Sequence, residues 1–328
     1  MTRKKNLIDI LESSCDIKIL KVLLSDKTTN ENIIWATNDY EDLGERYNFH
    51  SPITIETITR NNGQVIKPRA DKEKSIQILR SREKAEVFTP AWVCNSQNNL
   101  IDDAWFGVRA KRFNTEKNCS WKTNYYKVKF PENKSWKEYV LANRLEISCG
   151  EAPYLTSRYD MVSGKYITVK RRIGLLDRKI RVISENTETF NEWKKWTLKA
   201  LQSIYGFEWQ GDNVLLAREN LLYAVIESFN DKFNQLPDNA YILKCADIIA
   251  WNIWQMDGIK YVIPDTCHNI INSQLSLFGL DDVNEESCPG CKNNNALQHN
   301  GVYANIMDWK SNQIVRFVDL IKGGTLYG

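Results

Sequence analysis

The 328-residue sequence has no apolar run close to the roughly 20 residues that a helix needs to cross a bilayer. Residues 1–5 are basic, but the segment that follows is amphipathic and acidic, unlike the continuous apolar core of a signal peptide. These absences predict a cytoplasmic protein that has no membrane partner.

The sequence also has little net charge. It carries 44 Lys and Arg against 41 Asp and Glu, a formal charge of +3. This value does not by itself require a nucleic-acid partner, although a local basic patch can exist within it. Hydrophobic residues (42%) and charged residues (26%) have ordinary shares, which indicates a globular protein of one large or two modest domains.

Cysteine is present without the regular spacing of a disulfide framework. Eight Cys in a chain of this length predict free thiols and one metal cluster in a cytoplasmic protein. Cys288-Pro289-Gly290-Cys291 is a tight Cys-x-x-Cys turn, a good half-site because successive turn N–H groups stabilise thiolates. With further ligands it would make a tetrahedral structural zinc site, whereas two free thiols in a loop are the alternative. The predicted ligands are Cys267, Cys288, Cys291 and His299, with His268 as the alternative fourth ligand.

The pattern of apolar and polar residues divides the chain into four parts. They are a helical N-terminal extension, an α/β core, a Cys/His insertion, and a C-terminal strand and helix that would face a partner. Alternation of strand and helix in the core predicts a parallel sheet, with an insertion at 156–200. Helices are also expected at 30–39 and 314–321. The four parts span residues 1–75, 76–263, 264–300 and 301–328.

The core is organised around one short stretch, residues 145–155. It begins as an apolar run, turns on small residues, and resumes with Pro153, Tyr154 and Leu155. That order is typical of a buried strand, a tight turn and the first turn of a helix. Small residues in such a turn let backbone N–H groups approach a ligand closely at the carboxyl end of a strand. An ordinary strand-to-helix corner is the alternative.

Two later acidic residues also follow expected strands or turns. Residues 203–209 predict a second strand with Glu208 near its end, before a long helix at 212–229. A carboxylate at a strand tip can accept two O–H hydrogen bonds from a ribose, each charge-assisted. Asp257-Gly258 predicts a turn with a carboxylate pointing out of it. A solvated strand-end Glu is the alternative for Glu208.

Basic and aromatic residues alternate between 107 and 140, from Arg109 to Lys137. This interleaving suits a nucleic-acid backbone with base stacking. A solvated, twisted hairpin whose aromatic rings pack underneath it is the favoured alternative.

Four segments, taken in order, resemble the gamma-type DNA adenine-N6 methyltransferases of restriction–modification systems. Val87-Phe88-Thr89-Pro90 resembles the Phe/Tyr-Thr-Pro motif, which lies over the methionine part of S-adenosylmethionine. Residues 146–155 resemble the cofactor turn, whose usual form is Asp/Glu-Pro-x-Cys-Gly-x-Gly-x-Phe-Leu. Tyr205-Gly206-Phe207-Glu208 and the helix after it resemble the ribose strand. Residues 252–257 resemble the segment whose Asp approaches the cofactor's adenine.

The resemblance implies a Rossmann-like, S-adenosylmethionine-dependent methyltransferase sheet. Two residues depart from the cofactor turn: Ile147 replaces the usual Pro, and Ala152 replaces the second Gly. Ala is compatible with the turn if this residue does not need a positive φ. The cofactor-binding residues that the resemblance implies are Phe88, Thr89, Pro90, Glu146, Cys149, Gly150, Ala152, Tyr154, Glu208, Trp209 and Asp257.

The catalytic motif of that family, Asn/Asp-Pro-Pro-Tyr/Phe, is absent, because the sequence contains no Pro-Pro. In the family this motif holds the target amine and stacks on the flipped base. The expectation is therefore the cofactor-binding half of a split DNA adenine-N6 methyltransferase, with no catalytic residue in this chain. A second polypeptide would bring the catalytic motif and the target-recognition domain to double-stranded DNA. A catalytically inactive, methyltransferase-like scaffold or a DNA-binding interaction subunit is the alternative; a nucleotide-binding oxidoreductase is disfavoured because Gly-x-Gly-x-x-Gly is missing.

Overall fold

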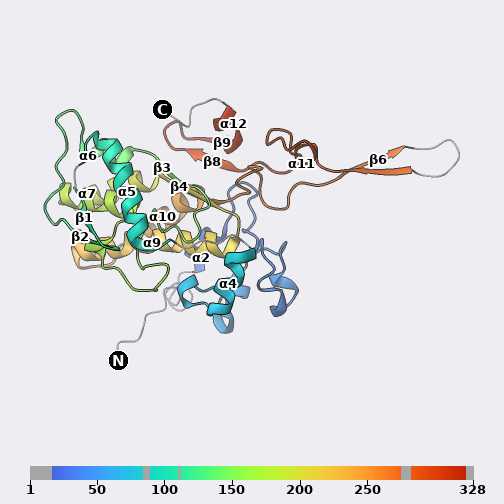
Figure 1. The fold of residues 1–328 in the computed structure, drawn as a ribbon, viewed down its shortest axis with the longest axis horizontal. Coiled ribbons are helices and arrows are strands. Elements are labelled where there is room, and N and C mark those ends of the chain that lie inside the picture. Colours follow the sequence, from blue (N-terminus) through green and yellow to red (C-terminus); the bar gives the residue numbers. More distant parts are fainter. Residues whose placement is uncertain (1–16, 84–88, 110–111, 275–281, 323–328) are drawn as a thin grey trace.

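The computed structural model describes residues 17–83, 89–109, 112–274 and 282–322 (Figure 1). At its centre lies a three-stranded parallel sheet in the order β3-β4-β5. Leu145 lies opposite Tyr205, and Phe207 lies opposite Trp254. The parallel pairing expected from the alternation of strand and helix is therefore confirmed within a mixed α/β structure. The strands are β3 (Arg144–Glu146), β4 (Ile204–Glu208) and β5 (Ile253–Gln255).

Helices make both crossovers of this sheet. Two of them connect β3 to β4 and fall inside the segment expected as an insertion, and two connect β4 to β5. The helix expected to start at Pro153 is wrong. The carbonyls of Tyr154 and Leu155 accept hydrogen bonds from the first N–H groups of the next helix, so they cannot propagate a helix of their own. The crossover helices are α7 (Leu175–Asn186), α8 (Phe190–Leu201), α9 (Gly211–Phe233) and α10 (Asn239–Asn252).

The two faces of the sheet are covered differently. On one face Ile204 and Ile253 pack with the crossover helices in the main core. On the other, Phe207 and Trp254 pack against Phe317 in a smaller core. The C-terminal elements supply this second cover (Figure 1). They are β8 (Asn305–Asp308), β9 (Gln313–Arg316) and α12 (Phe317–Lys322).

The helix expected at 314–321 begins only at Phe317. The residues before it form β9, which pairs antiparallel with β8. Ile314 is 57% exposed, so its side chain did not need the buried face that helical spacing implied. Antiparallel pairing with β8 therefore determined the structure of residues 313–316, although their apolar residues have helical spacing.

The N-terminal part is helical only in places. Helix α2 (Ile17–Leu24) packs against α10, and α3 (Ile55–Ile58) is a single turn. The helix expected at 30–39 is wrong, because this segment is irregular, with isolated β-bridges at Asn32 and Ile34. The Gln255 side chain accepts a hydrogen bond from the N–H of Ile34 at 2.9 Å and donates one to its carbonyl at 2.8 Å. These two hydrogen bonds satisfy the backbone N–H and carbonyl of Ile34, which helical hydrogen bonds would otherwise satisfy.

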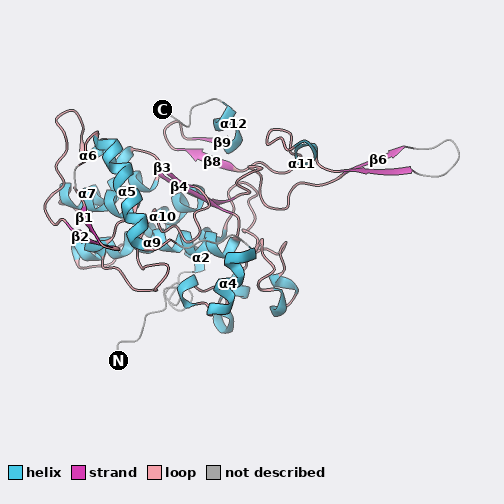
Figure 2. Cartoon of the chain, in the orientation of Figure 1, coloured by secondary structure: helices cyan, strands magenta, loops and turns pink. Residues whose placement is uncertain are grey.

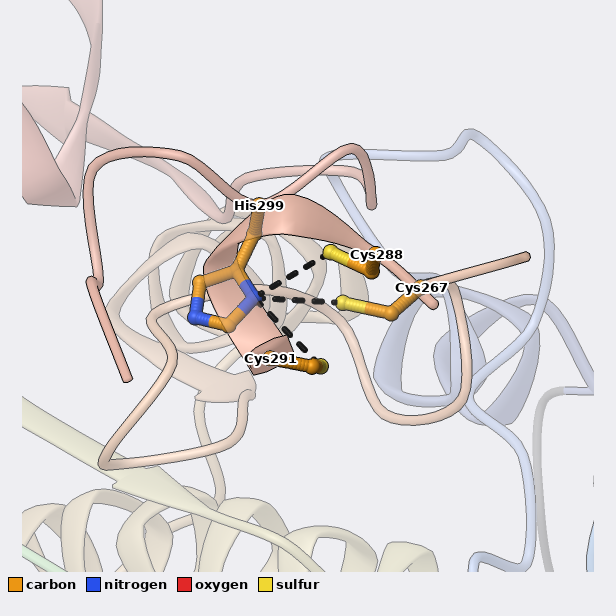
Figure 3. Close-up of side chains that lie close together, drawn as sticks. All are labelled: Cys267, Cys288, Cys291 and His299. Carbon is orange, nitrogen blue, oxygen red and sulfur yellow. Dashed lines mark hydrogen bonds between the residues drawn. The ribbon is translucent and has the colours of Figure 1, made fainter. Parts of the chain in front are cut away.

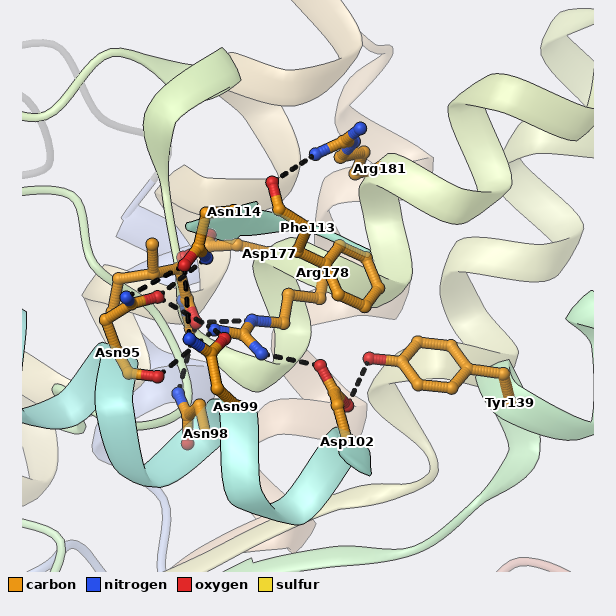
Figure 4. Close-up of polar contacts among 12 residues, drawn as sticks. Asn95, Asn98, Asn99, Asp102, Phe113, Asn114, Tyr139, Asp177, Arg178 and Arg181 are labelled. Carbon is orange, nitrogen blue, oxygen red and sulfur yellow. Dashed lines mark hydrogen bonds and ion pairs between the residues drawn. The ribbon is translucent and has the colours of Figure 1, made fainter. Parts of the chain in front are cut away.

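Helix α5, expected with Pro90 as its first residue, begins one residue later at Ala91. It is held to α7 by Arg178, whose guanidinium is buried (Figure 4). Arg178 donates to Asp102 at 2.5 Å and to Asn95 at 2.9 Å. The remaining elements on this side are α4 (Lys74–Glu83), α5 (Ala91–Phe106), β1 (Asn114–Lys117), β2 (Ser120–Thr123) and α6 (Trp136–Leu141).

A two-stranded antiparallel arm extends from one end of the molecule (Figure 2). It is built from β6 (Ile270–Gln274) and β7 (Asp282–Glu286), and the short helix α11 (Pro289–Asn293) lies at its base. The predicted metal ligands lie at this base. Among the described residues, none of the helices has both the length and the apolar character required to cross a membrane.

Candidate functional site

The turn after β3 has an unusual backbone. Ser148, Gly150 and Ala152 have φ values of 48°, 52° and 62°, all in the left-handed region. The Cys149 N–H donates to the carbonyl of Phe207 at 2.9 Å, which ties the turn to β4. The Cys149 side chain packs on Gly206, where a Cβ would lie 3.2 Å from its sulfur. The turn is therefore held against the central strand of the sheet.

Ala152 does need a positive φ, so the condition under which Ala is compatible with the turn is not met. Its left-handed backbone costs about 1–2 kcal/mol. Ala152→Gly would remove that cost. It would also lose the burial of one methyl group, ~0.8 kcal/mol, and raise the conformational entropy of the unfolded chain, which lowers the free energy of unfolding by about 0.4–1 kcal/mol. We expect these effects nearly to cancel, so that the free energy of unfolding changes by less than about 0.8 kcal/mol in urea titrations.

Ala217, in α9, provides the matched control because it is equally buried, at 0% exposed. Ala217→Gly loses a methyl group and helix propensity without relieving strain, so it should cost about 2 kcal/mol. Equal costs for the two variants would contradict the strain assigned to Ala152.

Two buried carboxylates face this turn. Glu146 Oε1 accepts a hydrogen bond from the Tyr154 N–H at 3.4 Å, whereas its buried Oε2 has no partner among the described residues. Glu208 accepts from the Gly150 N–H at 2.8 Å and from the Gln210 N–H at 3.3 Å. Burial raises the pKa of both carboxyls, and the charge of Glu208 adds to the rise at Glu146. A cationic ligand would stabilise the charged form of both carboxyls and so lower both pKa values.

Thr89, which shortly precedes α5, and Asn98 on α5 both contact the same turn. Thr89 is hydrogen-bonded to Tyr154, and burial raises the pKa of the Tyr154 phenol. Asn98, on α5, donates to the Tyr154 carbonyl at 2.9 Å. Pro90 precedes the helix, and Phe88 lies outside the described residues. Of the Phe-Thr-Pro segment, Thr89 thus contacts a residue of the turn.

Trp209 and Asp257 follow the carboxyl ends of β4 and β5. Trp209 is fixed by a hydrogen bond from its indole N–H to the Ala36 carbonyl at 3.0 Å. Asp257 Oδ1 accepts from the N–H groups of Ile259 and Lys260 at 2.8 and 3.0 Å, which confirms the expected turn. Both side chains line a cleft of about 260 Å³ at the base of the arm.

Four of the predicted metal ligands come together (Figure 3). The Nδ1 atom of His299 lies 3.5 Å from the sulfur of Cys267, 3.6 Å from that of Cys288 and 3.7 Å from that of Cys291. All four ligand atoms lie within 4.8 Å of one another. Zn–S and Zn–N bonds of about 2.3 and 2.0 Å at a tetrahedral angle place S and N about 3.6 Å apart. The cluster thus has the dimensions of a Cys₃His site and can bind a metal such as zinc.

The surroundings of the cluster fit metal binding and settle the fourth ligand. The Asn300 N–H donates to the Cys288 sulfur at 3.3 Å. Although burial opposes it, this and neighbouring hydrogen bonds lower the pKa of the Cys288 thiol to about 6. Gly290 allows His299 to approach, because a Cβ there would lie 2.5 Å from its Nδ1. His268 is exposed and lies outside the cluster, so Cys267 is the better ligand.

The basic and aromatic segment packs against the rest of the molecule, for example through Trp121, whose indole N–H donates to the Arg171 carbonyl. It forms the β1–β2 hairpin, and Lys134 and Lys137 lie over the rings of Trp105 and Trp136. These contacts favour the hairpin alternative over a nucleic-acid surface. Tyr125 and Tyr126 are exceptions, at 70% and 84% exposed.

Sequence patterns did not identify Phe49 and Lys260, which also line the cleft. Lys260 carried a usable signal, since it follows the Asp257-Gly258 turn by two residues. Phe49 carried none, because it comes from a loop distant in sequence. A comparison of the chain with known protein families, curated proteins and solved structures found no match.

Proposed function

We propose that this chain is the S-adenosylmethionine-binding subunit of a DNA adenine-N6 methyltransferase with a Rossmann-like sheet. The observation that carries the proposal is the buried Oε2 of Glu146, at the carboxyl end of a parallel strand and beside a left-handed turn. The N–H groups of Tyr154 and Leu155 act on this carboxyl, but Oε2 has no hydrogen-bond partner within the part of the chain that the structure describes. The methionine part of S-adenosylmethionine carries two cationic groups, an ammonium and a sulfonium, beside a single carboxylate. A buried carboxylate that lacks a partner favours such a ligand.

The chain's own residues would orient the cofactor. Glu146 would accept from the ammonium group, and Glu208, at the tip of β4, would accept from the ribose hydroxyls. Asp257 would accept from the exocyclic amine of the adenine. When bound, the cofactor supplies an electrophilic methyl group for transfer to the amine of a target adenine in DNA.

The catalytic motif would come from a second polypeptide, which the open edge of the sheet supports. The Arg144 N–H donates to the carbonyl of Ser203, the residue before β4, so the backbone groups of Leu145 and Ile147 point to the opposite side. No described strand pairs there. Leu145 is 40% exposed and Ile147 is 68% exposed. An edge of this kind can accept a partner strand.

Reconstitution tests the split enzyme. The chain would be mixed with a polypeptide encoded beside it that carries the Asn/Asp-Pro-Pro-Tyr/Phe motif, and transfer of labelled methyl groups to adenine in double-stranded DNA would be measured. Transfer is expected only with both chains. A mixture that binds S-adenosylmethionine without methylating DNA would favour the inactive scaffold instead.

Cofactor binding can be tested on this chain alone. S-adenosylmethionine should raise the melting temperature of the wild type. Glu146→Gln should weaken its binding by at least about tenfold, because a charge-assisted hydrogen bond to the ammonium group is lost. Adenosine, which lacks that group, is the matched ligand and should bind the variant and the wild type equally in calorimetry. Equal S-adenosylmethionine affinities for the two proteins would refute the role of Glu146.

We also propose that the metal is zinc, in a cytoplasmic protein. The Cys₃His ligand set suits zinc, and all the described cysteines are free thiols. Metal analysis of the purified chain should find about one equivalent of zinc. A value below about half an equivalent would count against the site.

A further inference from the structure

The cleft at the base of the arm joins the proposed cofactor site to the metal cluster. Trp209 and Asp257 form one wall, where β4 and β5 end. Cys267, Cys288 and Cys291 also line this cleft and form a second part of its wall. Three of the four metal ligands therefore line a space large enough for a ligand. A metal bound there would stabilise the lining of this cleft as well as the base of the arm.

The first wall suits a planar base with an exocyclic amine. Phe49 and Trp209 lie edge to face with their ring centroids 6.3 Å apart, and both line the cleft. Asp257 is 7% exposed and uses one carboxylate oxygen to cap its own turn. Its second oxygen has no hydrogen bond to another described residue, so it can accept from an amine.

The part of the lining that the cysteines form depends on the metal cluster for its structure. Helix α11, which carries Cys291 and directly follows Cys288, has five residues, too few to be stable alone. Lys260 links the two walls directly. Its backbone N–H donates to Asp257, and its side chain is hydrogen-bonded to Cys291.

We propose that the metal centre shapes the purine end of the cofactor pocket, so that metal binding and purine binding stabilise each other. The inference rests on the proposed cofactor site. Metal loss would release α11 and the Lys260 contact, and with them one wall of the cleft. Because linkage is reciprocal, a purine in the cleft would hold the metal more tightly by the same factor.

Calorimetry with adenosine tests the inference on the full chain. The zinc-loaded protein, the protein stripped by a chelator, and the stripped protein reloaded with zinc would be compared. Stripping is expected to weaken adenosine binding by at least about tenfold, a typical coupling between sites, and reloading to restore it. In the reciprocal experiment, saturating adenosine should slow zinc transfer to a chromogenic chelator.

Two variants and one spectrum separate the outcomes. Cys291→Ser should lose zinc and adenosine affinity together, whereas Cys119→Ser, an exposed thiol in the β1–β2 turn, should change neither. Far-UV circular dichroism should show that the stripped chain keeps its helices. Equal adenosine affinity with and without zinc would overturn the linkage and leave the proposed function standing. Failure of the zinc-loaded wild type to bind adenosine would overturn both. Asp257→Asn should weaken adenosine binding relative to the wild type while it retains zinc.

Discussion

Replacing Arg178 by methionine is expected to lower the free energy of unfolding by about 3–5 kcal/mol. The guanidinium is 1% exposed and joins α5 to α7 through Asp102, Asn95 and Asn99 (Figure 4). Methionine fills a similar volume but leaves Asp102 without its cation. Tyr139 still donates to Asp102 at 2.8 Å, but one neutral hydrogen bond does not replace the lost charge. Urea titration of the variant and wild type measures the difference.

Arg316 provides the matched control. It also pairs with an aspartate, Asp319, at 2.8 Å, but its side chain is 51% exposed. After Arg316→Met, water solvates the carboxylate of Asp319, so the free energy of unfolding should fall by less than about 1 kcal/mol. Similar costs for the two variants would contradict the role of burial. Asp102→Asn combined with Arg178→Met should recover part of the loss, since the charge left behind is removed.

Sequence patterns predicted the parts of the fold that depend on local spacing. The long helix α9 and strand β4 were found because their apolar residues repeat at the helical and buried-strand periods. The helix expected at 30–39 was wrong because Gln255, more than two hundred residues away, pairs with the backbone of Ile34. No local pattern records a contact of that range.

The candidate metal site was predictable for a chemical reason. The Cys-x-x-Cys turn fixes two ligands by covalent spacing, and few other residues in the segment can complete the set. The choice between Cys267 and His268 needed the structure, because adjacent residues in an extended segment point to opposite sides. The backbone strain at Ala152 was also invisible, since a sequence does not report φ.

Replacing Glu219 by glutamine is expected to stabilise the protein at alkaline pH. Glu219, on α9, is 4% exposed. Burial raises the pKa of its carboxyl to about 8, and the charge of Arg158 opposes the rise only in part. Arg158 is already paired with Glu227 at 2.7 Å, and no ion pair among the described residues includes Glu219. The folded chain therefore holds a proton that the unfolded chain releases near pH 4.5.

The sign of the pH dependence follows from this order of pKa values. In the wild type, the contribution of Glu219 to the free energy of unfolding is fully present below about pH 4.5. It is lost as pH rises toward 8, which lowers the free energy of unfolding by on the order of 2–5 kcal/mol in all. Glu219→Gln stays neutral, so it should match the wild type near pH 4 and exceed it near pH 9. Glu188→Gln, at an exposed position between α7 and α8, should leave the profile unchanged. Parallel profiles for Glu219→Gln and the wild type, measured by urea titration from pH 4 to 9, would show that Glu219 is ionised in the folded chain, with its charge compensated there.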